Sequence, residues 1–282
     1  MLRKCLFAQA VVLSVLLAAY PALAEFEIKL PAAVDVGAPF FLKMYGPEGF
    51  TGIHLRWQNK QVYVPAVDGK AALLLGASLE SSAGVHPVVG ELEVDGRRRT
   101  FAREITVQAR TFPEQRLRVA GEMVSPDPAE MPRIEEERRQ VRQVLDRVTE
   151  QRYWDEPFVR PVTGSVSSQF GLRRFFNDQP RAPHRGVDLR GAVGAPVLAF
   201  SAGQVVLTGD HYFAGKSVYI DHGLGMVTQY IHLSETSVAP GQTVAAGQVV
   251  GKVGATGRVT GPHLHFGLSV LGMWVDPLPL LQ

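Results

Sequence analysis

Two histidines lie one residue apart near the end of the chain, where residues 260–267 read Thr-Gly-Pro-His-Leu-His-Phe-Gly. Side chains on a β-strand alternate between its two faces, so His263 and His265 are expected on one face and Leu264 and Phe266 on the other. The apolar face can then pack while both imidazoles face a cleft. Imidazole is a common metal ligand, so this stretch indicates part of a metal site.

A second stretch offers the further ligands that two imidazoles need, because residues 183–189 read Pro-His-Arg-Gly-Val-Asp-Leu. A spacing of four places His184 and Asp188 on one face of an extended strand, and Gly186 between them leaves that face open. The pair would also be neighbours on a helix, but the nearby proline, glycine and valine favour the extended form. Two histidines and one carboxylate around an open fourth position are the arrangement of catalytic zinc, whereas a single histidine is usually an ordinary surface or core residue.

These two stretches resemble the lysostaphin-type and LytM-type zinc endopeptidases, which cut the peptides of bacterial peptidoglycan. The similarity covers about residues 158–280, and further motifs follow in the family's order. They are residues 168–171 (Ser-Gln-Phe-Gly), 194–197 (Gly-Ala-Pro-Val), 218–223 (Val-Tyr-Ile-Asp-His-Gly), 230–234 (Tyr-Ile-His-Leu-Ser) and 247–251 (Gly-Gln-Val-Val-Gly). The resemblance implies one zinc per chain, held by His184, Asp188 and His265, with His263 and His232 near the metal-bound water.

Zinc held by three protein ligands lowers the pKa of its bound water to about 7 and polarises a carbonyl group. Amide hydrolysis then needs a group that takes a proton from this water and passes it to the leaving amine. His263 shares a strand face with His265, so it is the leading candidate for the base. His232 is the second candidate, for the same proton transfer or for stabilising the oxyanion. The expected function is a zinc-dependent endopeptidase that hydrolyses peptide cross-links of peptidoglycan.

Two other functions stay open. A set of two histidines and one carboxylate also binds Fe(II) in non-haem oxygenases, although hydrolysis accounts better for the additional histidines. Some relatives have lost ligands and act as regulators that bind the cell wall and activate other hydrolases. All three ligand positions and both accessory histidines are present in this chain, which favours the enzyme.

Residues 1–24 are typical of a secretory signal peptide, because Arg3 and Lys4 precede an apolar run over residues 6–17 and Ala-Leu-Ala ends the segment. A retained membrane anchor is the alternative, although a glutamine and a proline interrupt the run. The single cysteine, Cys5, lies in this segment, so the mature chain would hold its metal through nitrogen and oxygen. We expect a periplasmic or otherwise exported protein with no stable membrane span after signal cleavage.

The charges of the chain nearly balance. It has 29 Lys and Arg against 27 Asp and Glu, and removing Arg3 and Lys4 with the signal peptide leaves 27 of each. A chain without a general basic field is a poor ligand for nucleic acid. The expected partners are the stem peptides of peptidoglycan and no nucleic acid.

The first part of the mature chain, residues 25–110, consists of short β-rich runs separated by turn signals. They lie at residues 26–30, 40–45, 53–57, 61–64, 71–75, 88–94 and 100–107. Asp95 and Gly96 between the last two runs predict a tight hairpin. Seven short strands without a helical period predict an immunoglobulin-like β-sandwich.

The rest of the chain is expected to form a linker with a helix, residues 111–156, and a zinc metallopeptidase domain, residues 157–282. The helix is predicted over about residues 133–152 from a narrow apolar stripe, which packs on a domain or, alternatively, on a partner helix. The stripe is Ile134, Val141, Val144, Leu145 and Val148. Glycine-rich hairpin signals predict an antiparallel β catalytic domain of lysostaphin type, so the fold class is mostly β.

A loop over residues 172–183 leads directly into His184 and contains Arg173, Arg174 and Arg181. Loops beside a metal commonly shape the substrate groove. These arginines could meet carboxylates of a stem peptide, or they could simply be solvated.

Overall fold

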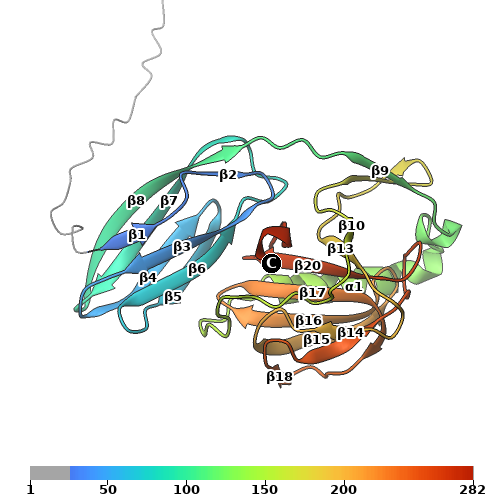
Figure 1. Cartoon of the computed structure of the whole chain (residues 1–282). Helices are drawn as coiled ribbons and strands as arrows, with labels where there is room; N and C mark the ends of the chain where they lie inside the picture. The colour runs from blue at the N-terminus through green and yellow to red at the C-terminus, as the bar shows by residue number, and fades with distance from the viewer. Residues whose placement is uncertain (1–25, 282) are drawn as a thin grey trace, which may run out of the picture.

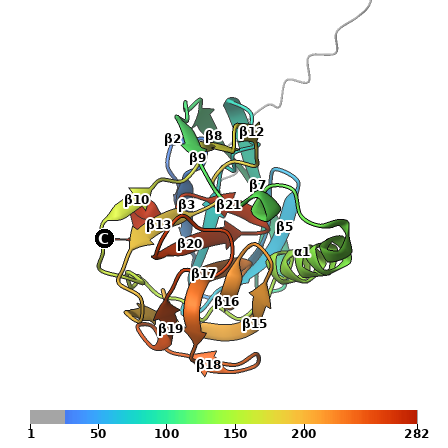
Figure 2. The same ribbon diagram turned by 90° about the vertical axis from the view of Figure 1, so that its right-hand side faces the viewer.

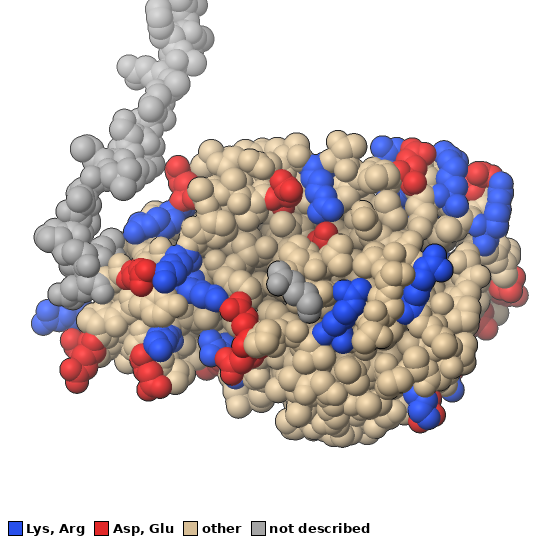
Figure 3. All heavy atoms as spheres, viewed as in Figure 1, with Lys and Arg blue, Asp and Glu red and all other residues tan. Residues whose placement is uncertain are grey.

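The computed structural model describes residues 26–281, and within them the chain is mostly β-strand with one α-helix. The predicted signal peptide, residues 1–24, lies outside the described residues. Among the residues that are described, no helix has both the length and the apolar character needed to cross a membrane. Basic and acidic side chains are interspersed over the face shown in Figure 3.

The N-terminal part consists of two sheets, coloured blue to green in Figure 1. One sheet has the order β1-β3-β6, and the other has the order β2-β8-β7-β4-β5. The strands are β1 (Glu27–Lys29), β2 (Ala33–Asp35), β3 (Pro39–Tyr45), β4 (Phe50–Trp57), β5 (Lys60–Pro65), β6 (Lys70–Gly76), β7 (Gly84–Val94) and β8 (Arg97–Gln108).

Alternation explains why these runs form strands with one buried face. In β3 the side chains of Phe40, Leu42 and Met44 are buried while their neighbours are partly exposed, as the period of two requires. The predicted hairpin is present, since Asp95 and Gly96 both have positive φ and join β7 to β8. All seven predicted runs overlap observed strands. The immunoglobulin-like assignment of this part stays a prediction.

The linker contains a strand that was not anticipated, β9 (Glu114–Leu117), followed by the short 3-10 helices η2 (Gly121–Met123) and η3 (Pro128–Glu130). In Figure 1 the chain runs from β8 over to β9, which pairs in parallel with β11 (Arg173–Phe176). β11 also pairs with β12 (Gln179–Pro180). Part of the predicted linker is therefore a structural element of the C-terminal part.

The helix α1 (Met131–Leu145) is shorter than predicted. It lies beside β15 and β16 of the C-terminal sheet (Figure 2), where Val144 and Leu145 pack against Tyr219 and Val227. The predicted end at residue 152 is wrong, and Val148 lies beyond the helix with 43% of its surface exposed. Beyond the helix the backbone instead bonds to the sheet, with the Leu224 amide donating to the Thr149 carbonyl.

The C-terminal part is one large antiparallel sheet with the main order β10-β13-β20-β17-β16-β15-β18. Its strands are β10 (Val166–Ser168), β13 (Val187–Arg190), β14 (Pro196–Leu198), β15 (Gly203–His211), β16 (Gly215–Gly223), β17 (Met226–Thr236), β18 (Thr243–Val244), β19 (Val249–Val253), β20 (His263–Val270) and β21 (Met273–Val275), with the 3-10 helix η4 (Leu278–Leu280) at the end. β20 lies between β13 and β17, so both histidines of the His-x-His pair are at the centre of the sheet.

The N- and C-terminal parts are in direct contact. The ring of Phe41 lies 5.8 Å from that of Trp154, and the Asp276 amide donates to the Gly37 carbonyl over 2.7 Å. A Cβ atom at Gly76 would overlap the side chain of Val275. The two parts therefore share a packed boundary as well as a linker.

Candidate functional site

The three predicted ligands meet at one point. Asp188 in β13 lies opposite His265 in β20 in the strand register, and His184 comes just before β13. His184 Nε2 is 3.0 Å from Asp188 Oδ1 and 2.9 Å from His265 Nδ1, and the latter atom is 2.9 Å from Asp188 Oδ1. Within residues 26–281, this triad is the one group of three or more His, Cys, Asp or Glu side chains that are close enough together to hold a metal ion.

Gly186 makes this convergence possible. A Cβ atom at this position would overlap the Phe266 carbonyl oxygen and would lie 2.7 Å from His265 Nε2. A side chain would therefore push the His184 segment away from β20. The prediction that Gly186 leaves the face open is confirmed, although His184 precedes the strand rather than lying on it.

A hydrogen bond beside the triad directs the lone pair of His184 Nε2 toward its centre. The Nδ1 atom of His184 lies 2.7 Å from the Gln169 carbonyl, so it donates its proton there and leaves Nε2 as an acceptor. Burial lowers the pKa of His265 to about 4, so this ring is neutral at neutral pH. Burial alone raises the pKa of Asp188, but hydrogen bonds and charge interactions with His184 and His265 outweigh it and hold that pKa well below its usual range.

The triad fits a small cation of the zinc type. His184 Nε2 and Asp188 Oδ1 are acceptors 3.0 Å apart, and His265 Nδ1 is 2.9 Å from each of them. A proton on His265 Nδ1 would bond to these two acceptors but would not lie between them, whereas a cation would satisfy all three atoms. A tetrahedral ion with bonds of about 2.0–2.1 Å has ligand edges of about 3.3 Å, close to the observed spacing. Two nitrogens and one carboxylate oxygen are ligands that zinc accepts.

His263 and His232 are the next side chains beside the triad. His263 Nε2 lies 3.7 Å from Asp188 Oδ1, and the rings of His232 and His263 are 5.1 Å apart. Each ring places Nδ1 against a backbone carbonyl, that of Gly261 for His263 at 2.8 Å and that of Thr256 for His232 at 2.9 Å. Donation from Nδ1 leaves Nε2 of both rings able to accept a proton.

His232 is held in a constrained state. Its φ of 66° is unusual for a residue other than glycine, and its amide donates to the Ala214 carbonyl over 2.9 Å. Burial, followed by charge interactions with His265 and His263, lowers the pKa of His232 well below the ordinary value. The ring is therefore neutral at neutral pH, and strained backbone of this kind is often found at functional sites.

Comparison with known proteins agrees with this geometry, because the sequence model of Peptidase family M23 matches residues 182–277. The chain contains a peptidase family M23 domain. The matched residues include the whole triad together with His232 and His263. The resemblance to the lysostaphin-type and LytM-type peptidases is thereby confirmed at the level of the family.

Curated relatives share the M23 region. Peptidoglycan DD-endopeptidase ShyA of Vibrio cholerae is 46% identical over 114 residues, which is 40% of this chain and 26% of that protein. DD-carboxypeptidase/endopeptidase Mpg of Neisseria meningitidis is 40% identical over 113 residues, again 40% of this chain and 26% of that protein. The chain thus spans about a quarter of the length of these relatives.

A solved structure extends the likeness beyond the M23 domain. A crystal structure from Pseudomonas aeruginosa, assigned to peptidase M23, matches with a TM-score of 0.68 and 29% identity. The match covers 87% of this chain and 94% of that one. It therefore includes most of the N-terminal part.

The other histidines lie outside the M23 triad and are bonded within the fold. Each has a partner that explains it: Glu93 for His54, the Ser82 carbonyl for His86, Ser217 for His211, and Ala202 with Thr228 for His222. These contacts agree with the general expectation that a single histidine is an ordinary surface or core residue.

The burial of His222 predicts that the folded protein loses stability in mild acid. Burial lowers its pKa from 6.5 to about 4, so the unfolded chain takes up a proton at this group before the folded chain does. The folded state loses no stability from this group above pH 6.5, and the loss grows as the pH falls toward 4. It amounts to about 3 kcal/mol at 1.36 kcal/mol per pKa unit. Denaturant unfolding at pH 7 and pH 4.5 should show a smaller difference in His222→Gln than in wild type; equal differences would contradict this assignment.

An outer network supports the M23 triad, and part of it comes from the linker. Arg174 Nη2 donates to Asp188 Oδ2 over 2.8 Å, and Arg174 Nε donates to Gln115 Oε1 over 3.0 Å. Gln115 Nε2 donates to Ser168 Oγ over 3.1 Å, and Ser168 Oγ is 3.3 Å from His184 Nδ1. The sequence carries no signal for Gln115, because its role depends on the parallel pairing of β9 with β11.

Replacement of Gln115 by Ala is expected to weaken zinc binding by about tenfold, since outer partners orient metal ligands. Competition with a chromophoric chelator measures this affinity. Glu114→Ala is the matched control, because Glu114 is the neighbour on β9 and pairs with the exposed Arg173. Equal affinities of Gln115→Ala and Glu114→Ala would show that the network does not position the ligands.

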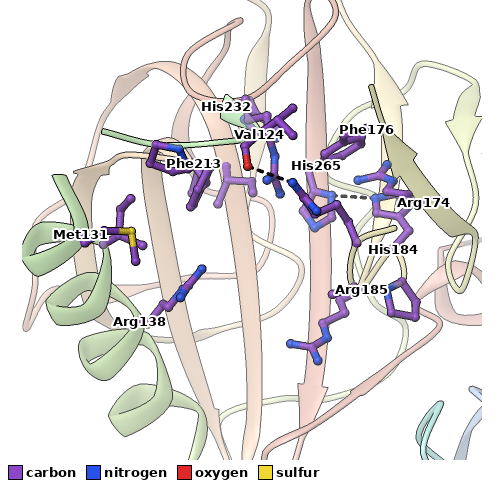
Figure 4. A pocket seen from close by; sticks show the side chains of 18 residues that line it. Val124, Met131, Arg138, Arg174, Phe176, His184, Arg185, Phe213, His232 and His265 are labelled. Atoms are coloured by element: carbon purple, nitrogen blue, oxygen red, sulfur yellow. Dashed lines mark hydrogen bonds between the residues drawn. The ribbon is translucent and has the colours of Figure 1, made fainter. Parts of the chain in front are cut away.

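A cleft of about 520 Å³ opens beside the triad (Figure 4). Its lining includes His184, His232 and His265, with Phe213 and Arg138 on the side of α1. Val124 and Pro126 of the linker line it, and hydrogen bonds to two backbone carbonyls hold this segment in place. Arg181 Nη2 donates to Val124 O over 2.9 Å, and the Tyr212 hydroxyl donates to Glu122 O over 3.1 Å.

Proposed function

We propose that the protein is a zinc-dependent endopeptidase that hydrolyses peptide cross-links of bacterial peptidoglycan, in the periplasm or after export. The observation that supports this most is the convergence of His184 Nε2, Asp188 Oδ1 and His265 Nδ1 beside two further histidines. The M23 domain and relatives named as DD-endopeptidases support the same substrate class. A DD cross-link, such as the D-Ala to diaminopimelate bond, is the proposed target.

His184, Asp188 and His265 would hold the zinc through the three atoms that face one another. When bound, zinc supplies a Lewis acid that polarises the scissile carbonyl and lowers the pKa of a water molecule to about 7. Arg174 and the Gln169 carbonyl hold Asp188 and His184 in the orientation that presents these atoms. The chain thus provides a preformed site before substrate arrives.

His263 and His232 would carry out the proton transfers. His263 Nε2 is next to the triad, so we assign it as the group that accepts the proton of the attacking water and returns it to the leaving amine. His232, with Nε2 available, would share this transfer or donate to the developing oxyanion once protonated. The carbonyls of Gly261 and Thr256 keep both rings in the required tautomer.

The proposed organisation is a signal peptide at residues 1–24, an immunoglobulin-like sandwich at 25–110, a linker with a helix at 111–156 and the zinc metallopeptidase domain at 157–282. The change of strand arrangement after β8 supports the first boundary within the described part of the chain. The pairing of β9 with β11 ties the linker to the peptidase domain.

Digestion of purified sacculi with residues 25–282 tests the function directly. We expect cross-linked muropeptides to fall and monomers to rise with zinc present, and neither change with a chelator present. Mass spectrometry of the products identifies the bond that is cut. Unchanged cross-linking in the zinc-loaded sample would contradict the enzyme and favour the wall-binding regulator.

A further inference from the structure

Arg258 is a partly buried guanidinium at the cleft that the motifs did not single out. It lies between two aromatic rings, with its guanidinium carbon 4.5 Å from the ring centre of Phe176 and 4.5 Å from that of Phe213. Within residues 26–281 the guanidinium makes one long hydrogen bond, from Nη1 to the Met123 carbonyl at 3.4 Å. Two such cation–π contacts restrict the movement of the guanidinium.

The charge of Arg258 is not compensated. Within residues 26–281 no ion pair joins it to a carboxylate, and the charged groups that affect it most are Arg174, Arg181 and Arg138. Burial and these three like charges lower the pKa of Arg258 to about 10, still well above neutral pH. Keeping a desolvated cation among other cations costs stability, so the arrangement calls for an anion.

The neighbouring arginines differ in whether they pair with a carboxylate. Arg174 is paired with Asp188. Within the described part of the chain, Arg181 donates only to oxygens of uncharged groups, the carbonyls of Pro180 and Val124 and the side chain of Gln179. Arg138 extends from α1 toward the cleft in Figure 4. Among residues 26–281, Asp188 is therefore the one carboxylate that pairs with any of these four arginines.

Arg258 places this group of four arginines beside the triad. Arg258 lines the cleft that contains His184 and His265, and it also lines a second hollow of about 230 Å³ that contains Asp188 and His263. A ligand held by Arg258 would consequently lie beside the groups proposed to carry the reaction.

We propose that Arg258, assisted by Arg181 and Arg138, forms a carboxylate-binding subsite that positions an acidic substrate peptide for cleavage. This inference rests on the proposed peptidase function. A guanidinium packed against two rings presents a fork of N–H donors, which matches a carboxylate in two parallel hydrogen bonds. The subsite would favour a substrate with a free carboxylate near the scissile bond over one with a carboxamide at that place.

Two cross-linked peptides test the subsite, one with a free carboxylate on the residue next to the scissile bond and one with a carboxamide there. Charge-assisted hydrogen bonds of this kind correspond to a preference of roughly 10- to 100-fold. We expect wild type to show this preference in kcat/KM. Arg258→Gln should lose it by slowing cleavage of the carboxylate peptide while changing the carboxamide peptide by less than about twofold.

Matched variants separate recognition from folding. Arg258→Lys keeps the charge without the fork, so it should retain part of the preference. Arg138→Gln should weaken the preference, whereas Arg139→Gln should not, because Arg139 pairs with Glu136 on the exposed side of the same helix. Thermal unfolding and zinc content check that each variant is folded.

The outcomes distinguish this inference from the proposed function. Equal cleavage of both peptides by wild type, or equal slowing of both by Arg258→Gln, would overturn the subsite while leaving the peptidase intact. If wild type cleaves neither peptide, the proposed function fails. Calorimetry then still decides the subsite, because wild type should bind the carboxylate peptide at least tenfold more tightly than Arg258→Gln does, and equal affinity would overturn it.

Discussion

Substitution of His184, Asp188 or His265 by Ala should each remove the zinc and abolish measurable peptidase activity. Each substitution leaves two protein ligands, and two ligands in a protein site that normally provides three bind zinc far more weakly. Elemental analysis of the purified protein should give about one zinc per wild-type chain and less than about one tenth in each variant. The same measurement separates zinc from iron, the metal of the alternative oxygenase function.

His86→Ala is the control for a general effect of losing a histidine. His86 lies in β7 and hydrogen-bonds the Ser82 carbonyl, away from the triad. It should keep its zinc and its activity. Full zinc occupancy in His265→Ala would refute the ligand assignment, and loss of zinc in His86→Ala would show that the metal depends on the overall fold.

The local part of this site was predictable from the sequence because it follows from strand periodicity. His263 and His265 were expected on one face, and Leu264 and Phe266 are indeed fully buried on the other. The same alternation located the strands of the N-terminal part. It missed β2, Ala33–Asp35, in which Val34 is the only bulky apolar side chain, so no alternation marks it.

The nonlocal part could not be predicted, because it depends on which distant segments pair. Gln115 reaches the triad only through the pairing of β9 with β11, and Arg258 gains its rings from two separate segments. The end of α1 is a similar case. Val148 continues the helical spacing, but Thr149 bonds Leu224 and Asp221 of the sheet instead, so tertiary contacts end the helix earlier.

The two accessory histidines should behave differently from the ligands. His263→Ala and His232→Ala are each expected to keep about one zinc per chain and to lower kcat by about 10²- to 10⁴-fold, the range for loss of a positioned acid or base. Neither ring is needed for the triad contacts, since His184, Asp188 and His265 already meet without them. Single-turnover assays on a defined cross-linked peptide, with zinc measured on the same samples, test both statements.

The double variant His232→Ala/His263→Ala then shows whether the two rings act together. With ring centres 5.1 Å apart, they can serve one reacting group in succession, and residues that act as a unit give strongly non-additive losses. We expect the double variant to be no more than about tenfold slower than the slower single variant. Losses that multiply would assign the rings to separate steps, one to the proton of the water and the other to the oxyanion. If either single variant keeps full activity, that histidine has no catalytic role, and if it loses zinc, it belongs with the ligands.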